Sequence, residues 1–252
     1  MIFKLVNLNI WIGGKLFDSA IDFLSKENPD ILTLQEAFNG LGDELPKNER
    51  TIEILKQELG YKYSFFSKCF MDEATKGKVD RGNAILSRFP IVATDDVFYD
   101  RPYGVYSENR PQDFPILPRT IQHAEIKINN QIVNVFNTQG IWGLDGGDNK
   151  RRLGMSKIIL DQVKGKDNVI LAGDFNVKPN TKTINNIEKL FINVFKDELK
   201  TTFNMKRKTN PGYATAVVDM IFVSENIEIV SHTCPQVDVS DHFPLVCTFN
   251  IK

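Results

Sequence analysis

Cysteine is scarce in this chain: Cys69, Cys234 and Cys247 are spread across 252 residues. An odd number of widely spaced cysteines forms neither a disulfide framework nor a zinc pattern. A reducing compartment is the simplest inference. The chain also begins directly with a strand-like segment, which leaves no room for a signal peptide. We therefore expect a cytoplasmic protein.

Excess charge and long apolar runs are absent as well. With 31 Lys and Arg against 32 Asp and Glu, the formal net charge is −1. A protein that depends on non-specific affinity for nucleic acid would carry a global basic field, which this chain lacks. Lys206-Arg207-Lys208 is the best local candidate, although a solvated loop is the simpler interpretation. No apolar run approaches the roughly 18–20 residues that span a bilayer, so we expect no transmembrane segment.

The residues that are present are typical of a globular α/β protein, with 42% hydrophobic and 25% charged. Helical spacing predicts helices over 17–27, 49–59 and 150–164, and a short one that Asn180 caps and that runs to about Leu190. Asn129-Asn130 predicts a hairpin turn. We expect a monomer with one domain over residues 1–252. Strands are predicted near 2–10, 30–36, 62–70, 82–87, 91–99, 119–128, 131–138, 168–173, 218–224, 226–234 and 244–251.

The most informative stretch is 170–176, which reads Ile-Leu-Ala-Gly-Asp-Phe-Asn. An apolar strand stops at Gly173 and presents Asp174 and Asn176 two residues apart. Strand side chains alternate, so both would point the same way, with Phe175 turned into the protein. A carboxylate can accept a proton from water, and an amide can donate to a developing oxyanion. An Asx turn that closes a buried strand is the structural alternative.

Other predicted strand ends also carry polar side chains. Ser240-Asp241-His242 precedes an apolar strand, where either a proton-exchanging histidine or a surface turn would fit. Asp219 interrupts an apolar strand, and a buried carboxylate needs a partner, usually a histidine or a cation. Gln35-Glu36 delivers an acid at a strand exit, and Asn9 lies among apolar residues. Such oxygen-rich strand ends favour a hard-cation site, with Mg²⁺ the typical occupant.

In order, these segments and Arg81 to Arg88 resemble the endonuclease/exonuclease/phosphatase superfamily, the deoxyribonuclease I-like group. The similarity spans essentially the whole chain. It implies an α/β fold, a four-layer α/β/β/α sandwich of two packed mixed β-sheets with outer helices. It also implies Mg²⁺ or Mn²⁺ as cofactor. Glu36 looks like the principal metal ligand, with Asn9 and Asp241 completing or supporting the metal shell, whereas Asn7 is better explained as structural.

The resemblance implies catalytic roles for four further residues. Asp174 would align or deprotonate the attacking water, and Asn176 would help hold the phosphoryl oxygens. His242 would contact the scissile phosphate. Asp219 would orient His242 through its other ring nitrogen.

One position departs from the family pattern. Where many relatives read Asn-Thr-His, this chain reads Asn137-Thr138-Gln139. Gln139 exchanges hydrogen bonds but is no general acid near neutral pH. Members of the superfamily also use a tyrosine here, so activity need not be lost, but protonation of the leaving group is in question.

Substrate selection is expected in the loops over the active face. The loop from Tyr99 to Pro118 would either contact the substrate, by stacking on a base or clamping a phosphate, or act as a stiff connector. The glycine-rich loop after Gln139 carries Trp142. Arg151 and Arg152 begin the next helix, where a solvated helix start is the simpler interpretation. Our candidates for substrate contacts are Gln139, Trp142, Arg119 and Asn83.

The sequence therefore predicts a metal-dependent phosphoesterase, in which metal-positioned water attacks phosphorus directly. A phosphodiesterase or nuclease is the first hypothesis, with nucleic acid among the possible substrates. A phosphatase or a sphingomyelinase-like phospholipase on the same scaffold is the alternative. Because of Gln139, a non-catalytic binding protein is another. A glycosidase with paired carboxylates would leave Asn176 and His242 without a role.

Overall fold

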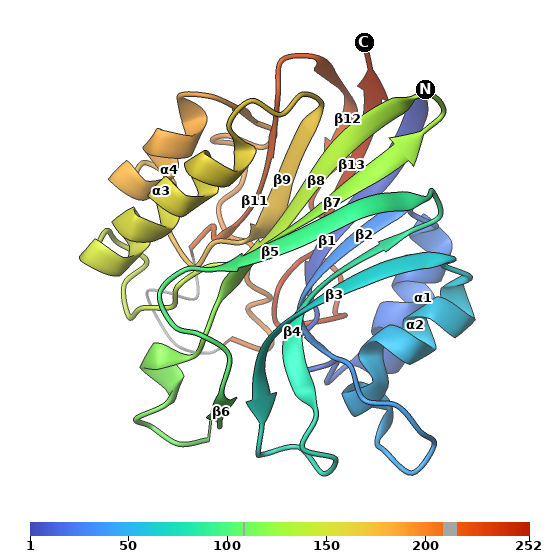
Figure 1. The fold of residues 1–252 in the computed structure, drawn as a ribbon, viewed down its shortest axis with the longest axis vertical. Coiled ribbons are helices and arrows are strands. Elements are labelled where there is room, and N and C mark those ends of the chain that lie inside the picture. The colour runs from blue at the N-terminus through green and yellow to red at the C-terminus, as the bar shows by residue number, and fades with distance from the viewer. Residues whose placement is uncertain (108, 209–215) are drawn as a thin grey trace.

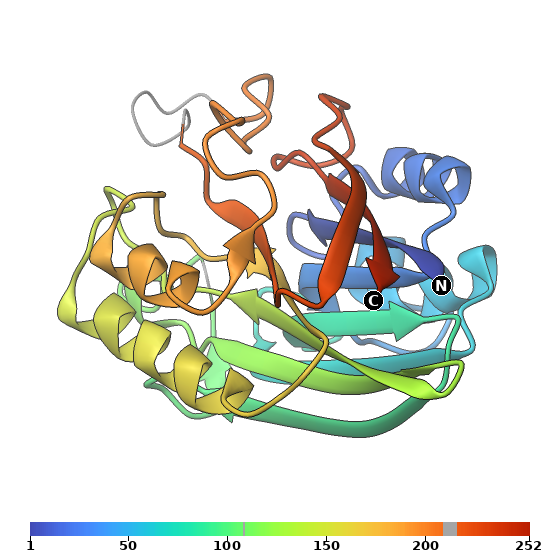
Figure 2. The same cartoon turned by 90° about the horizontal axis from the view of Figure 1, so that it is seen from above.

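Two β-sheets pack face to face in the computed structural model, which describes residues 1–107, 109–208 and 216–252. Helices cover the outer face of each sheet, as Figures 1 and 2 show. The expected four-layer α/β/β/α sandwich is confirmed. Within the described ranges, no helix has the length and apolar character needed to cross a membrane.

The first sheet has seven described strands and the second has six. The order of the first is β12 (Ile227–Thr233), β13 (Leu245–Ile251), β1 (Ile2–Asn9), β2 (Ile31–Phe38), β4 (Asp80–Ser87), β3 (Tyr63–Asp72) and β6 (Val105–Tyr106). The order of the second is β10 (Ile192–Asn193), β11 (Asp219–Val223), β9 (Val169–Asp174), β8 (Gln131–Gln139), β7 (Thr120–Ile128) and β5 (Ile91–Phe98).

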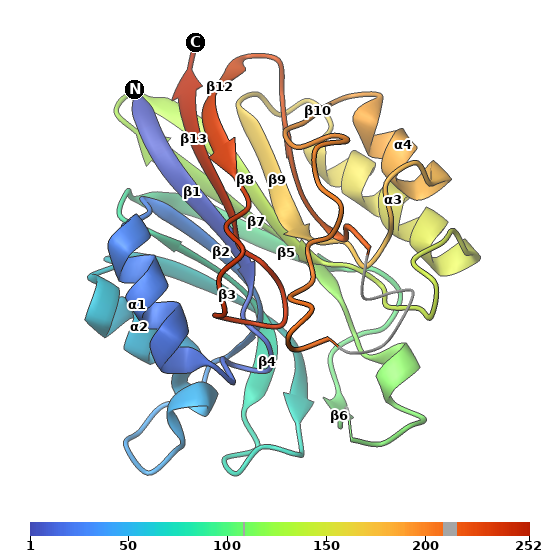
Figure 3. The ribbon, with the colours of Figure 1, turned by 180° about the vertical axis from the view of Figure 1, so that it is seen from behind.

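Both sheets are mixed. In the first, β1 runs parallel to β2 and antiparallel to β13, so the two chain termini lie close together (Figure 3). In the second, β8 runs parallel to β9, whereas β11 is antiparallel to β9. Parallel neighbours end at the same edge of a sheet. The carboxyl ends of β1 and β2, and those of β8 and β9, therefore deliver their last side chains together.

Three apolar layers hold the sandwich together. Phe3, Val135 and Phe249 belong to the cluster between the two sheets. The outer face of the first sheet packs against helices α1 (Phe17–Glu27) and α2 (Thr51–Leu59). The outer face of the second packs against α3 (Lys150–Val163) and α4 (Lys182–Glu188). Each helix buries one apolar side, as its periodicity predicts.

Two predicted helix starts are corrected. The helix expected from 49 is a 3₁₀ turn, η1 (Lys47–Arg50), followed by α2. Its Glu49 is buried and accepts hydrogen bonds from the amides of Lys76 and Gly77, at 2.6 and 2.8 Å. The cap of α4 is Thr181, whose hydroxyl accepts from the backbone of Ile184. Asn180, the expected cap, instead has a left-handed φ of 62°.

Strand β2 is longer than predicted and irregular. Its pairing with β4 shifts register between Leu34 and Ala37, and Glu36 in this bulge has a φ of 60°. Bulges are known to re-aim a side chain next to a functional site. Glu36 therefore does not lie at a strand exit as expected but at a kink within the strand. Two short strands, β6 and β10, and the 3₁₀ turn η2 (Phe114–Ile116) were not predicted from the sequence.

Candidate active site

The polar strand ends of the two sheets meet at one place. Asn9 pairs in register with Gln35 across the parallel strands β1 and β2. Asp174 pairs with Gln139 on one side and with Asp219 on the other. The side-chain amide of Asn9 donates to Asp174 Oδ2 at 3.0 Å and so joins the first sheet to the second.

A cavity of about 370 Å³ opens over these strand ends. Its described lining residues are Trp11, Ile12, Glu36, Arg81, Asn109, Phe114, Arg119, Gln139, Trp142, Asp174, Asn176, Phe203, Lys208, Asp241 and His242.

Most of the site residues predicted from the sequence contribute to this lining. Two others, Asn9 and Asp219, support it from behind, since each bonds to a lining side chain. Asn83 lies elsewhere: it is fully buried, and its amide donates to the backbone and hydroxyl oxygens of Thr120, both at 3.2 Å. Asn7 accepts hydrogen bonds from Thr33 and Gln35, as a structural role requires.

Asp174 and Asn176 form an Asx turn that also faces the cavity. The backbone amide of Asn176 donates to Asp174 Oδ1 at 2.9 Å, and Asn176 has a φ of 54°. Phe175 between them is fully buried against Phe222. The two readings of this motif are therefore compatible, because the turn places the carboxylate and the amide on the same side. Burial raises the pKa of Asp174 to about 6, with Asp219 adding to the rise and His242 opposing it.

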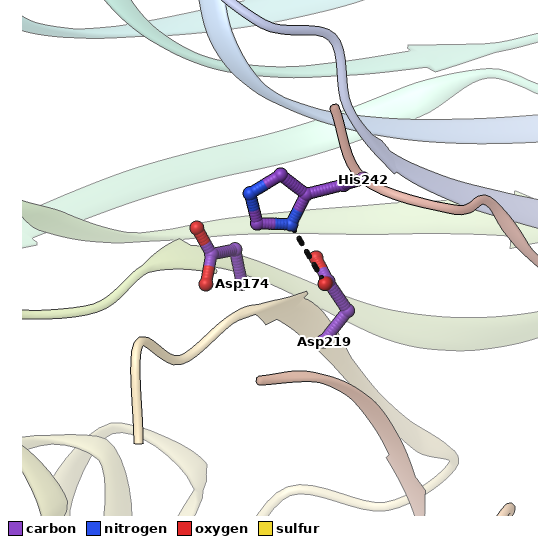
Figure 4. Close-up of side chains that lie close together, drawn as sticks. All are labelled: Asp174, Asp219 and His242. Carbon is purple, nitrogen blue, oxygen red and sulfur yellow. Dashed lines mark hydrogen bonds and ion pairs between the residues drawn. The ribbon is translucent and has the colours of Figure 1, made fainter. Parts of the chain in front are cut away.

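His242 is bonded to the buried carboxylate of Asp219. Its Nδ1 lies 2.8 Å from Asp219 Oδ2, and Figure 4 shows Asp174 facing the same ring. The Phe203 ring packs edge-on at 4.6 Å. Burial alone would lower the pKa of His242, but the charge of Asp219 outweighs it and raises this pKa to about 9. The ring therefore carries a proton at neutral pH, and the partner expected for Asp219 is confirmed.

Glu36 is surrounded by donors. Its Oε1 accepts from the amides of Asn9 and Gln139, at 3.1 and 2.8 Å. Its Oε2 accepts from the backbone of Ile12 at 3.0 Å and lies 2.6 Å from Arg81 Nη2. Burial favours the neutral acid, but Arg81 and then Arg119 reverse this and hold the pKa of Glu36 far below its usual range.

A lysine contacts the other candidate metal ligand. Lys208 Nζ lies 2.8 Å from Asp241 Oδ2 and over the Phe203 ring. Burial would lower the pKa of Lys208, but Asp241 raises it. The preceding Arg207 pairs with Asp238 at 2.6 Å. Lys208 therefore contributes an ion pair to the cavity wall, while its side chain remains 37% exposed.

Arg119 is a cation of the cavity that has spare donors. Its side chain is buried, and its Nε and Nη1 have no hydrogen-bond partner in the described part of the chain. Burial and then the charge of Arg81 lower its pKa. A buried guanidinium with unused donors costs free energy unless an anion meets it. This arrangement fits a phosphoryl group.

Sequence reasoning did not assign Arg81 or Lys208 to the site. Arg81 begins the strand segment that contributed to the family resemblance, so its motif was visible but its contact with Glu36 was not. Lys208 was visible only as part of a basic run. Its approach to Asp241 depends on the backbone amide of Asn204, which donates to the Asp241 carbonyl at 2.9 Å.

Several solved structures have folds similar to that of this chain. An endonuclease/exonuclease/phosphatase from Beutenbergia cavernae superposes with a TM-score of 0.75 at 18% identity, covering 99% of this chain and 72% of that one. D. rerio TDP2, complexed with a single-strand DNA product, superposes with a TM-score of 0.72 at 16% identity, covering 99% of each chain. Bacteroides thetaiotaomicron mannosyl-6-phosphatase superposes with a TM-score of 0.71 at 18% identity, covering 99% of this chain and 100% of that one.

No curated protein matches this sequence significantly. The model of the Endonuclease/Exonuclease/phosphatase family, in contrast, matches residues 7–242. That match includes every strand end that contributes to the cavity, from Asn9 to His242. The chain therefore belongs to the endonuclease/exonuclease/phosphatase family, whose members are hydrolases of phosphoesters.

Proposed function

We propose that this protein hydrolyses a phosphodiester with the help of Mg²⁺ or Mn²⁺. One observation supports this most strongly. A single cavity contains the carboxylate of Asp174, the protonated ring of His242 and the unused donors of Arg119. A base, a cationic stabiliser and an anion-binding group are the parts that phosphoryl transfer to water requires.

The oxygen atoms around the cavity suit a hard cation. We assign Glu36 and Asp241 as its ligands, with Asn9 in support, because carboxylate and amide oxygens are the groups that Mg²⁺ prefers. The four donors on Glu36 fill the roughly four lone-pair sites of a carboxylate, so a bound cation would replace at least one of them. When bound, it would polarise a phosphoryl oxygen and offset developing charge.

Asp174, Asp219 and His242 form a second acidic group, each offering one atom within 4.8 Å of the others. The ion pair explains this group without a metal. Asp219 holds His242 in its protonated form, and an imidazolium has no lone pair for a metal. The metal is therefore assigned to the Glu36 side of the cavity.

Asp174 is proposed to take the proton of the attacking water. With a pKa of about 6 it is ionised at neutral pH yet basic enough to accept a proton. Two amides, those of Asn9 and Asn176, donate to its Oδ2 and fix its orientation, at 3.0 and 3.3 Å. Water held against the outer face of this carboxylate would attack phosphorus without a covalent intermediate.

We propose that His242 and Arg119 balance the charge that develops on the phosphoryl oxygens. The Asn176 amide would donate to these oxygens by giving up its bond to the Gly140 carbonyl. Donors that are already oriented in a water-poor cavity stabilise a transition state better than mobile ones. Gln139 donates to Glu36, which supports a role beside the cation rather than as an acid. We also propose that residues 1–252 work as one domain, because both sheets contribute to the same cavity.

The test is hydrolysis of bis-p-nitrophenyl phosphate with added Mg²⁺ or Mn²⁺. Asp174→Asn and His242→Gln should each lower kcat by about 10²–10⁴, the usual cost of losing an acid–base group. Asp22→Asn, at an exposed position on α1, is the matched control and should have wild-type activity. Activity that needs no metal, or that survives either cavity substitution, would contradict the proposal. p-Nitrophenyl phosphate as a parallel substrate reveals a phosphatase.

A further inference from the structure

A second cavity, of about 630 Å³, adjoins the catalytic one. Asn109, Phe114 and Trp142 line both, so the two cavities share a wall. We call the second cavity the side groove. Its apolar lining residues are Pro111, Phe114, Pro115, Trp142, and Leu144.

The shared wall is aromatic. The rings of Phe114 and Trp142 lie 4.6 Å apart at 72°, an edge-to-face pair. The rigid rings of Pro111 and Pro115 line the same groove, and Leu144 beside them is 84% exposed. Large apolar side chains gathered at an open surface next to a catalytic cavity mark a place where a ligand is covered.

Two arginines fix the walls of the groove. Arg151 pairs with Asp100 and donates to the Pro115 carbonyl at 2.6 Å. Arg152, expected at a solvated helix start, is instead completely buried. It donates to the carbonyls of Ile141 and Gly147, at 3.0 and 2.6 Å, and so holds both ends of the loop that carries Trp142.

Arg152 also connects this loop to the catalytic motif. Its Nη2 donates to the carbonyl of Asn176 at 2.7 Å. A side chain on Gly143 would come within 2.8 Å of the same guanidinium, so the loop packs tightly against it. The position of Trp142 is therefore fixed relative to Asn176, and a ligand that fills both cavities meets a prepared surface.

We propose that the side groove binds an aromatic ring attached to the phosphoester substrate, an inference that rests on the proposed function. Aromatic and proline faces suit a flat ring, and stacking on such rings is tolerant of ring identity. The groove also has polar lining residues, Asn109, Asn149 and Arg151, which a ring with polar substituents can contact and an alkyl chain cannot. A nucleobase or a phenol ring meets both requirements.

Binding is measured by fluorescence in a Trp11→Phe, Asp174→Asn background with Mg²⁺ present. The chain has two tryptophans, so Trp142 is then the single reporter. Adenosine 5′-monophosphate should quench it and bind at least about tenfold more tightly than ribose 5-phosphate. Phenyl phosphate distinguishes the two sources of the ring. If it binds as tightly as adenosine 5′-monophosphate, the groove accepts any aryl group, and if it binds more weakly, the groove prefers a nucleobase.

A groove substitution tests where the ring binds. Leu144→Ser should weaken the binding of adenosine 5′-monophosphate about threefold or more, because an apolar contact is lost. The affinity for ribose 5-phosphate should stay unchanged. Leu41→Ser is the matched control, since Leu41 is 69% exposed and is not among the described lining residues of either cavity. Equal affinities for ribose 5-phosphate and both ring compounds would overturn the inference, as would octyl phosphate binding as tightly as the nucleotide.

The proposed subsite and the proposed hydrolysis are tested independently. A wild-type enzyme that cleaves phosphodiesters without any ring preference would contradict the subsite and support the proposed function. A protein that prefers ring compounds in the binding assay but shows no metal-dependent hydrolysis would keep the subsite and remove the function.

Discussion

His242 lies among acids that all act on its pKa in one direction. Asp219 has the largest effect, and Asp241 and Asp174 add to it. Asp174 is affected in the opposite sense by the same ring, whose positive charge limits the rise caused by burial. The two groups thus separate into a base that loses its proton near pH 6 and a cation that keeps its proton to about pH 9.

This separation predicts a bell-shaped pH profile of kcat/KM. Activity should fall as the pH drops through about 6, because Asp174 becomes protonated, and fall again as it rises through about 9, because His242 loses its charge. Asp219→Asn removes the main cause of the raised histidine pKa and should move the alkaline limb to lower pH. Rates with bis-p-nitrophenyl phosphate at fixed metal concentration measure both limbs. An alkaline limb that Asp219→Asn does not move would exclude His242 as the titrating group.

At the scale of the elements, Asn137 on β8 connects the two sheets below the cavity. Its Nδ2 donates to the carbonyls of Leu34 and Ala84, at 2.8 and 3.0 Å, in the first sheet. Its Oδ1 accepts from Gln35 at 2.6 Å. The side chain is fully buried, so these groups have no contact with solvent water that could substitute for the bonds.

Asn137→Ala should therefore lower the free energy of unfolding by about 2–4 kcal/mol, because several buried polar groups lose their partner. Urea denaturation followed by tryptophan fluorescence measures the change. Asn130→Ala, in the exposed β7–β8 turn, is the control and should cost less than about 0.5 kcal/mol. Equal effects of the two substitutions would show that the bonds between the sheets contribute little.

Element type was predictable because apolar spacing reflects which face each segment buries. Helix α1 and the hairpin at Asn129 follow directly from that pattern. The bulge at Glu36 was not predictable, since an extra residue in a strand leaves no periodic signal and depends on pairing with β4.

The site was predictable as a set of residues but not as a set of contacts. Asp219 in an apolar strand indicated a buried partner, and the partner is His242. The cations were harder to place. Whether Arg119, Arg81 or Lys208 reaches a carboxylate depends on how the sheets and loops pack, and the chain alone does not contain that distance.

At the scale of the whole molecule, the candidate metal ligands come from distant parts of the chain. Glu36 lies in β2, and Asp241 precedes β13. A cation that binds both in the folded state, and not in the unfolded chain, stabilises the fold by mass action.

Mg²⁺ or Mn²⁺ at a hundred times its dissociation constant should add about 2.7 kcal/mol and raise Tm by roughly 5–10 °C. Differential scanning fluorimetry with and without the metal measures the shift. Glu36→Gln should remove most of it, and Asp22→Asn should preserve it. A shift that persists in Glu36→Gln would place the cation elsewhere.

Neither sheet holds a complete set of reactive groups. Asn9 and Glu36 belong to one, Asp174 and Asp219 to the other, and the Asn9–Asp174 hydrogen bond crosses between them. A folding intermediate with one sheet formed would contain half of the chemistry and perform none of it. Turnover would then begin only when the two sheets pack together. The appearance of activity during refolding would therefore report the last step of assembly rather than the first.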